Sequence, residues 1–255
     1  MIKKIVALVA VTTGFLVGCS AVPTPSEQYA QYPAEKIYQI AEEKLASHHD
    51  KDAVQAFEGL DALYPFNKNA QQAQLDIIYA YYQVDNMVAA SAAAERYIRL
   101  YPRDKNVDYA YYMRGIANFN QDRGFFQRYF PVDQSVRDPG TMSQSYEDFK
   151  TLLKLFPNSI YAPDAKQHLI YLRNTFAKKN EAIASFYYQK QAYVAAIDRA
   201  NEVLIEYDDT PSAKQALIIL YNAYQKLGLK QSAAQTLSII QLNYPGTSLL
   251  FKPGE

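Results

Sequence analysis

The stretch AVQAFEGLDALYP at residues 53–65 decides the fold of this chain. It begins with a small residue, carries apolar side chains at helical spacing, and ends in an aromatic residue followed by proline. Proline lacks an N–H group and its ring clashes with the turn before it, so it ends a helix. The stretch therefore predicts a helix that packs closely through Ala53 and closes at Tyr64 and Pro65.

The same phrase returns along the chain with its aromatic residue at a fixed distance from the small one. The further copies are ASAAAERYIRLYP at 90–102, SYEDFKTLLKLFP at 145–157, AIDRANEVLIEYD at 196–208 and AAQTLSIIQLNYP at 233–245, with the fourth copy's proline delayed to residue 211. Successive aromatic residues are separated by 37, 55, 51 and 37 residues. Two of these intervals lie close to the period of about 34 residues typical of tetratricopeptide repeats. We predict an all-α fold, an α-solenoid of about five tetratricopeptide-like helix pairs.

The apolar periodicity predicts where the helices lie. They are expected near residues 34–47, 50–64, 70–83, 87–101, 107–120, 141–155, 163–190, 192–206, 212–227 and 230–243. The first long interval between repeats contains an insertion at 121–141, whose aromatic side chains favour packing against the repeats over disorder.

The N-terminus has the pattern of a secretory signal. Lys3 and Lys4 precede an uncharged run at residues 5–17, which is shorter than the roughly 20 residues of a spanning helix. The run ends in LVGC at 16–19, which resembles the lipobox of bacterial lipoproteins and implies cleavage before Cys19 and acylation of that residue. Cys19 is the only cysteine, and Ser20 rather than an aspartate follows it. In such lipoproteins this implies the periplasmic face of the outer membrane.

These features divide the chain into segments. We predict a signal peptide at 1–18, a lipidated, extended and flexible tether at 19–32, N-terminal repeats at 33–120, the insertion at 121–141 and C-terminal repeats at 142–250.

Composition and motifs exclude several classes of function. Basic and acidic residues number 26 each, and loss of Lys3 and Lys4 leaves 24 against 26, a net charge of −2 that gives no case for nucleic-acid binding. His48, His49 and His168 lack metal-ligand spacing, so no metal or cofactor is expected. The chain carries no recognisable catalytic motif, and we predict that it is not an enzyme.

Clusters of tyrosine are the remaining candidates for a binding surface. They are Tyr79, Tyr81 and Tyr82, and then Tyr109, Tyr111 and Tyr112, with Arg96, Arg99 and Arg114 nearby. Each tyrosine could pack in the core and hydrogen-bond between helices. Together, a wall of tyrosine and arginine would suit an extended peptide rich in aromatic residues, because these two residues dominate binding hot spots.

Several longer motifs resemble the BamD family of β-barrel assembly lipoproteins. They are YPF at 64–66, QQAQLDIIYAYY at 71–82, RYIRL at 96–100, DYAYYMRG at 108–115, VD at 132–133 with RDP at 137–139, FPNS at 156–159, and AYVAA at 192–196 with Arg199. The resemblance covers almost the whole mature chain, although the insertion's GFFQRYF at 124–130 is more aromatic and basic than this family's pattern.

The resemblance implies a non-enzymatic member of the outer-membrane β-barrel assembly complex, the BAM complex. Its N-terminal repeats would receive unfolded outer-membrane protein precursors, with Tyr64, Phe66, Tyr79 and Tyr82 as substrate-binding residues. Its C-terminal repeats would dock a POTRA domain of BamA, with Arg199 as the contact, and the accessory lipoprotein BamC would lie along the side. The alternative is a periplasmic repeat lipoprotein that scaffolds peptidoglycan enzymes.

Overall fold

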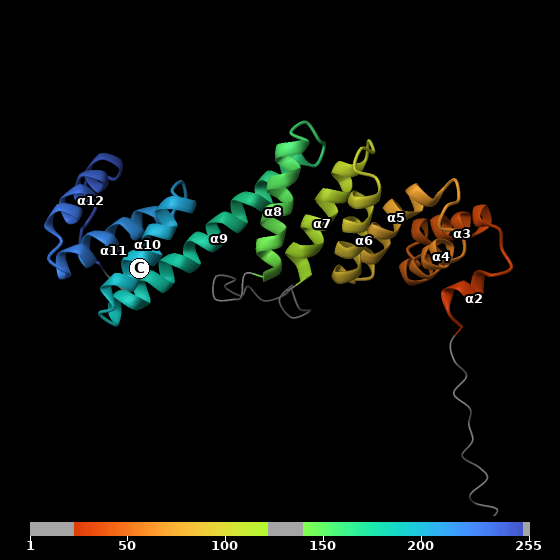
Figure 1. Ribbon diagram of the computed structural model, residues 1–255, viewed down its shortest axis with the longest axis horizontal. Helices are drawn as coiled ribbons and strands as arrows, with labels where there is room; N and C mark the ends of the chain where they lie inside the picture. Colours follow the sequence, from red (N-terminus) through yellow and green to blue (C-terminus); the bar gives the residue numbers. More distant parts are fainter. Residues whose placement is uncertain (1–22, 122–139, 252–255) are drawn as a thin grey trace, which may run out of the picture. The chain divides into compact units, whose positions relative to one another are not determined.

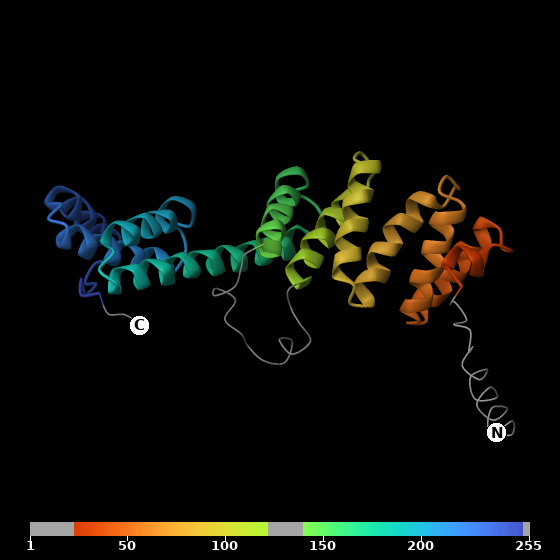
Figure 2. The ribbon, with the colours of Figure 1, turned by 60° about the horizontal axis from the view of Figure 1, so that its bottom comes forward.

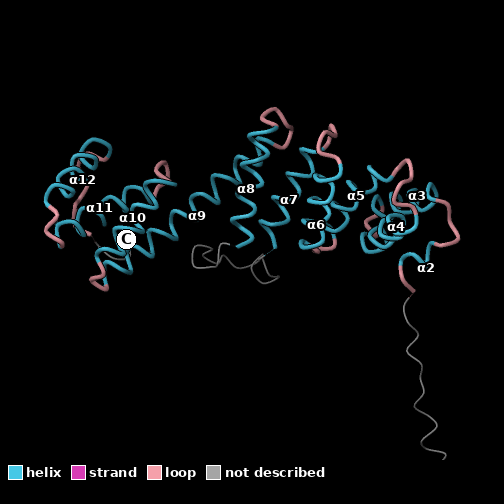
Figure 3. Tube along the Cα trace, in the orientation of Figure 1, coloured by secondary structure: helices cyan, strands magenta, loops and turns pink. Residues whose placement is uncertain are grey.

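The computed structural model describes residues 23–121 and 140–251. Within these ranges the chain forms helices and turns and no strand (Figure 1, Figure 3). The helices are α2 Pro25–Tyr29, α3 Ala34–Ala46, α4 Asp50–Leu63, α5 Ala70–Gln83, α6 Met87–Leu100, α7 Val107–Gln121, α8 Gly140–Leu155, α9 Ala162–Gln189, α10 Tyr193–Glu206, α11 Ser212–Lys226 and α12 Lys230–Asn243. The all-α prediction is confirmed, and α3 to α12 begin and end within one residue of the predicted bounds.

The chain divides into two compact units, Met1–Ile77 and Ile78–Glu255, and α5 contributes to both. In the first unit, α2 and α3 each pack on α4. In the second unit, each helix from α6 to α12 packs on the next one, and α9 also contacts α11. The second unit thus consists of helices that bury their apolar faces against their neighbours, as in repeat proteins.

The small residue that opens each repeated phrase is buried in every copy. We call it the register residue, and the five are Ala53, Ala90, Ser145, Ala196 and Ala233. Seven positions later a larger side chain is also buried in every copy, namely Leu60, Tyr97, Leu152, Val203 and Ile240. Residues seven apart lie on one face of a helix, so each of these helices presents the same face to its neighbours. The predicted repeat is therefore confirmed residue by residue.

The aromatic residue at the end of each phrase forms the same turn in all five copies. Its N–H donates to the carbonyl four residues earlier, as Tyr64 does to Leu60 at 2.9 Å. Its own carbonyl accepts from the N–H three residues later, and the donors are Asn67, Asp104, Ser159, Thr210 and Thr247. The turn after Tyr207 is the same although Asp208 stands where other copies have proline.

A second turn joins the two helices of most pairs. Its residue with positive φ lies five positions before the register residue, and these residues are His48 (58°), Asp85 (62°), Gln191 (61°) and Gly228 (71°). In the third pair the connection from Gln121 to Gly140 replaces this turn. The insertion predicted at 121–141 is thus bounded by helix at both ends, and residues 122–139, with the predicted packing of their aromatic side chains, lie outside the described residues.

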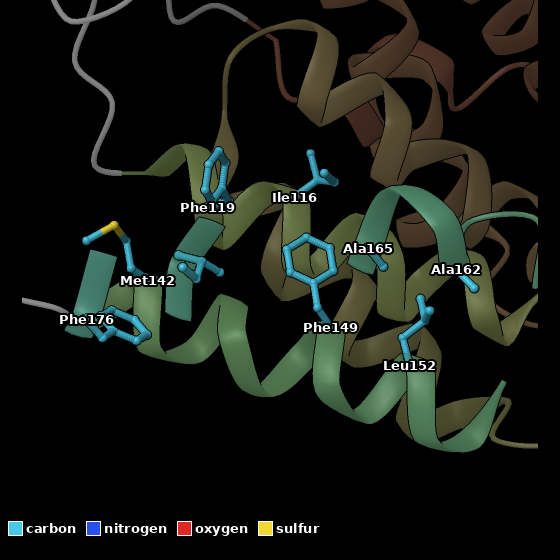
Figure 4. Close-up of a cluster of buried hydrophobic side chains, with 9 residues drawn as sticks. Ile116, Phe119, Met142, Phe149, Leu152, Ala162, Ala165 and Phe176 are labelled. Atoms are coloured by element: carbon cyan, nitrogen blue, oxygen red, sulfur yellow. The ribbon is translucent and has the colours of Figure 1, made fainter. Parts of the chain in front are cut away.

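Aromatic and aliphatic side chains of α7, α8 and α9 form a core in the second unit (Figure 4). Phe149 lies at its centre, and a Cβ atom on Gly115 would lie 2.7 Å from the Phe149 ring, so glycine lets α7 and α8 approach closely. The 28-residue helix α9 runs without a break from this core to a second one shared with α10 and α11 (Figure 2).

The predicted tether is wrong over its second half. Residues 25–29 form α2, because Pro25 opens the helix and Thr24 and Glu27 form a capping box. Tyr29 is buried, and a Cβ on Gly59 of α4 would lie 2.8 Å from the Tyr29 ring. Burial of this aromatic ring holds α2 on α4. The proline-rich composition of the segment gives no sign of this contact.

Candidate partner-binding surfaces

Cys19, the predicted lipidation site, lies outside the described residues. Among the residues that the structure describes, no helix is long and apolar enough to cross a membrane.

Tyr64 and Phe66 lie in the first unit and have different environments. Tyr64 is half-buried, and its hydroxyl donates to the carbonyl of Tyr32 at 3.1 Å, so it ties the segment after α2 to the end of α4. The Phe66 side chain is 96% exposed. Asn67 holds the turn in shape, since its amide donates to the Tyr64 carbonyl at 2.6 Å and its Oδ1 accepts from the N–H of Asn69 at 2.7 Å. Phe66 is therefore an exposed aromatic residue on an ordered turn.

Tyr79 and Tyr82 lie in the second unit, on α5. Tyr79 is 39% exposed, whereas Tyr82 packs against the core around Phe149. The four predicted substrate residues thus divide into two pairs, one in each unit. Within each pair, one aromatic side chain, Phe66 or Tyr79, is exposed and the other is half-buried.

The tyrosines of α7 serve mainly to pack helices together. Tyr112 stacks on Tyr161 with ring centroids 4.7 Å apart, and its hydroxyl donates to Asp164 at 2.8 Å. Burial and this carboxylate raise the pKa of Tyr112 well above its usual range. Tyr111 packs on Phe156. For these tyrosines the core-packing alternative is the better description.

Two of the arginines expected beside the tyrosines are engaged in ion pairs. Arg99 pairs with Glu95 on the surface of α6 at 3.7 Å. Arg114 pairs with the buried Asp148 of α8 at 2.6 Å, and Asn118 donates to the other oxygen of Asp148 at 2.7 Å. Burial raises the pKa of Asp148, and the Arg114 charge opposes that rise. Arg114 therefore joins α7 to α8 and is committed to the fold.

Arg199 lies on the exposed side of α10 in the second unit. Its guanidinium pairs with Glu202 at 2.9 Å, and both side chains remain more than two-fifths exposed. Glu202 also accepts from Asn180 of α9 at 3.1 Å, so the carboxylate that faces Arg199 is fixed by a neighbouring helix. An exposed pair of this kind adds little to stability, and Arg199 stays available to a partner.

Sequence reasoning missed two aliphatic side chains on the side of α10 that faces away from its buried residues Ala196, Ala200 and Val203. Val194 and Ile205 are 64% and 75% exposed. They are 11 residues apart, close to three helical turns, so they point in nearly the same direction. Alignment of the five repeats by register residue would have found them. Buried positions keep the same kind of residue in every copy, whereas the positions of Val194 and Ile205 are charged or polar in some of the other copies.

No group of three or more potential metal ligands occurs among the described residues. His168 stacks on Phe149 at 5.1 Å and lies 3.4 Å from Asp164, and His49 lies 3.0 Å from the Ser47 hydroxyl. These histidines take part in local packing and hydrogen bonding.

Repeated helix pairs whose equivalent positions are buried in every copy define a helical-repeat protein. A family model named YfiO and described as an outer membrane lipoprotein matches residues 30–239. The chain belongs to this family, whose curated relatives carry the name BamD.

The relatives match over nearly their whole length. The outer membrane protein assembly factor BamD of Vibrio cholerae is 39% identical over 228 residues, which are 89% of this chain and 93% of the relative. The protein of the same name from Neisseria meningitidis serogroup A is 36% identical over 252 residues, 97% of this chain and 94% of the relative.

Among solved structures, a putative kinesin light chain with TPR-like repeats from Podosopora anserina aligns with 87% of this chain and 96% of its own. The identity is 13% and the TM-score is 0.36. The repeat assignment rests on the matched register residues and turns.

Proposed function

We propose that this chain is a non-enzymatic, lipid-anchored scaffold that acts in the assembly of outer membrane proteins. The observation that carries the proposal is the match to relatives named as outer membrane protein assembly factors over more than nine-tenths of their length. A fold shared through repeats alone would preserve the small and apolar positions only. The identity of 36–39% over 89–97% of this chain is the support for a shared role in assembly.

The proposed anchor is a lipid on Cys19, which holds the protein on the periplasmic face of the outer membrane. The lipobox-like stretch at 16–19 supports this assignment. So does the match to a family described as an outer membrane lipoprotein. Acyl chains bind a membrane by burial of their methylene groups and need no spanning helix.

The proposed partner surface for BamA is on the C-terminal repeats, with Arg199 in contact with a POTRA domain. Its support is the position of Arg199 on an exposed helix face and the weak, solvent-exposed pair with Glu202. BamC is the proposed accessory partner along the side of the repeats.

The proposed substrates are unfolded outer-membrane β-barrel precursors, received on the N-terminal side. Phe66 and Tyr79 are exposed and can stack on aromatic side chains of an extended chain. Tyr64 and Tyr82 would support them from half-buried positions, Tyr64 by its hydrogen bond to Tyr32 and Tyr82 by contact with the core.

Affinity purification of the tagged lipoprotein from detergent-solubilised envelopes tests the proposal. We expect a large outer-membrane barrel protein with POTRA repeats to co-purify with the wild type and to be lost with Arg199→Glu. Arg99→Glu is the matched control, because Arg99 is also an exposed helical arginine paired with a nearby glutamate. Recovery of peptidoglycan enzymes alone would favour the alternative, a scaffold for those enzymes.

A further inference from the structure

Equivalent positions in the five repeats provide an internal control for what the fold requires. Positions that bury the same kind of side chain in every copy serve the core, as the register residues do. Positions that are exposed in every copy are free of that requirement. Aliphatic residues at two such positions of one helix are therefore not required by the core and form a candidate contact surface.

The position nine residues after the register residue is exposed in all five copies. The occupants are Ala62, Arg99, Lys154, Ile205 and Leu242. The fold accepts a charged residue here in α6 and α8, whereas α10 and α12 carry large aliphatic side chains that are 75% and 82% exposed.

The position two residues before the register residue is likewise exposed in all five copies. Its occupants are Lys51, Val88, Ser143, Val194 and Gln231. The helices that carry the register residues are α4, α6, α8, α10 and α12, and the structure describes all five. Among them, α10 alone carries large aliphatic side chains at both positions. This is also the helix that bears Arg199.

Charged residues border the two aliphatic side chains. Asp198 lies between Val194 and Ile205 on the same side of α10, and Glu206 follows Ile205. Both carboxylates are exposed. A partner that fits this face would offer apolar side chains to Val194 and Ile205, basic groups to Asp198 and Glu206, and a carboxylate to Arg199.

We propose that Val194 and Ile205 are the apolar anchors of the BamA-docking surface, so that the whole outward face of α10 binds the POTRA region. This inference rests on the proposed function and adds to it the residues that make the contact apolar at its centre. Exposed aliphatic side chains bordered by charges are typical of protein interfaces, whose centre is apolar and whose rim is polar. Arg199 then belongs to the rim and contributes mainly to orientation.

The experiment compares variants that borrow residues from other repeats. Val194→Lys introduces the residue found at 51, and Ile205→Lys the residue found at 154, so the fold is expected to accept both. In full-length protein purified from envelopes, we expect the double variant to recover at least tenfold less BamA with an unchanged circular dichroism melting curve. Val88→Lys, at the equivalent position of α6, should leave recovery unchanged.

The outcomes separate this inference from the proposed function. Undiminished BamA recovery by the double variant, together with release by Arg199→Glu, would overturn the role of Val194 and Ile205 and leave the docking assignment standing. Equal loss with Val88→Lys would also overturn it. If neither the double variant nor Arg199→Glu releases BamA, the docking site itself is wrong.

A photo-crosslinking residue decides the matter if the lysine variants fold poorly. Placed at position 205, it should yield a covalent product with BamA in intact cells, and at position 99 it should not. A product from 99 and none from 205 would overturn the proposal.

Discussion

Arg114 of α7 and Asp148 of α8 form an ion pair of 2.6 Å, in which the Asp148 side chain is only 3% exposed. Removal of the cation would leave a buried carboxylate without its main partner. We expect Arg114→Leu to lower the free energy of unfolding by about 2–4 kcal/mol, toward the lower side for buried pairs because Arg114 keeps some contact with water. Urea unfolding followed by circular dichroism would measure this change.

Two controls test the cause of that loss. Arg99→Leu breaks an exposed pair and should cost no more than about 0.5 kcal/mol. Arg114→Leu combined with Asp148→Leu should be more stable than Arg114→Leu alone, because no buried charge remains. A double variant less stable than the single one would show that the pair's packing, and not its charge, matters.

Gln191 adopts a left-handed backbone conformation, with φ of 61°, at the position where Gly228 stands in the next repeat. A residue with a Cβ atom is strained there, and glycine is not. We expect Gln191→Gly to raise the free energy of unfolding by about 0.5–1 kcal/mol. The midpoint of thermal unfolding checks it, with Gln167→Gly inside α9 as a control that should destabilise.

Gly59 contacts the N-terminal helix α2 so closely that a Cβ atom would lie 2.8 Å from Tyr29 and 3.0 Å from the carbonyl oxygen of Pro25. Alanine favours helix over glycine by about 1 kcal/mol, so α4 alone would gain from Gly59→Ala. We expect the variant instead to release α2 and expose Tyr29 to chymotrypsin. Limited proteolysis with mass spectrometry detects the cut, and an uncut variant would show that α2 tolerates the added methyl group.

Six of the tyrosines that the structure describes have pKa values raised above the ordinary value of 10 by burial, namely Tyr29, Tyr38, Tyr112, Tyr161, Tyr188 and Tyr207. Above pH 10 the unfolded chain loses these protons while the folded chain keeps them. The folded state then binds more protons, so its stability is retained below pH 10 and falls as the pH rises further.

The melting temperature should therefore drop steeply between about pH 10 and about pH 11. Tyr112→Phe cannot ionise and should make the drop shallower, whereas a substitution of the exposed Phe66 should not. A melting temperature that stays constant across this range would contradict the assignment.

Sequence reasoning succeeded where the fold repeats itself. The register residue and the closing aromatic residue occur together five times at a fixed spacing, which chance would not produce. The ends of α3 to α12 were therefore predicted to within one residue. Features that occur once were less predictable. α2 depends on contact between Tyr29 and Gly59, which are 30 residues apart, and the buried Arg114–Asp148 pair spans the insertion. Such contacts leave no periodic signal in one sequence.

The candidate site shows the same division. Phe66 and Tyr79 are exposed as a binding role requires, but sequence could not distinguish them from the half-buried Tyr64 and Tyr82. Exposure of a tyrosine or phenylalanine depends on which neighbour covers it, and an aromatic side chain is compatible with either environment. Val194 and Ile205 were not predicted as surface residues, because an aliphatic residue in a helix is usually part of the core.

The docking of α2 on α4 also sets the reach of the protein from its membrane. A free tether from residue 19 to residue 32 could extend about 45 Å. With α2 held through Tyr29, only the segment from Cys19 to Thr24 remains between the proposed lipid and the folded unit, which is about 17 Å when extended. The first repeat would then stay within a short height of the lipid headgroups, where a precursor chain bound for the outer membrane must arrive.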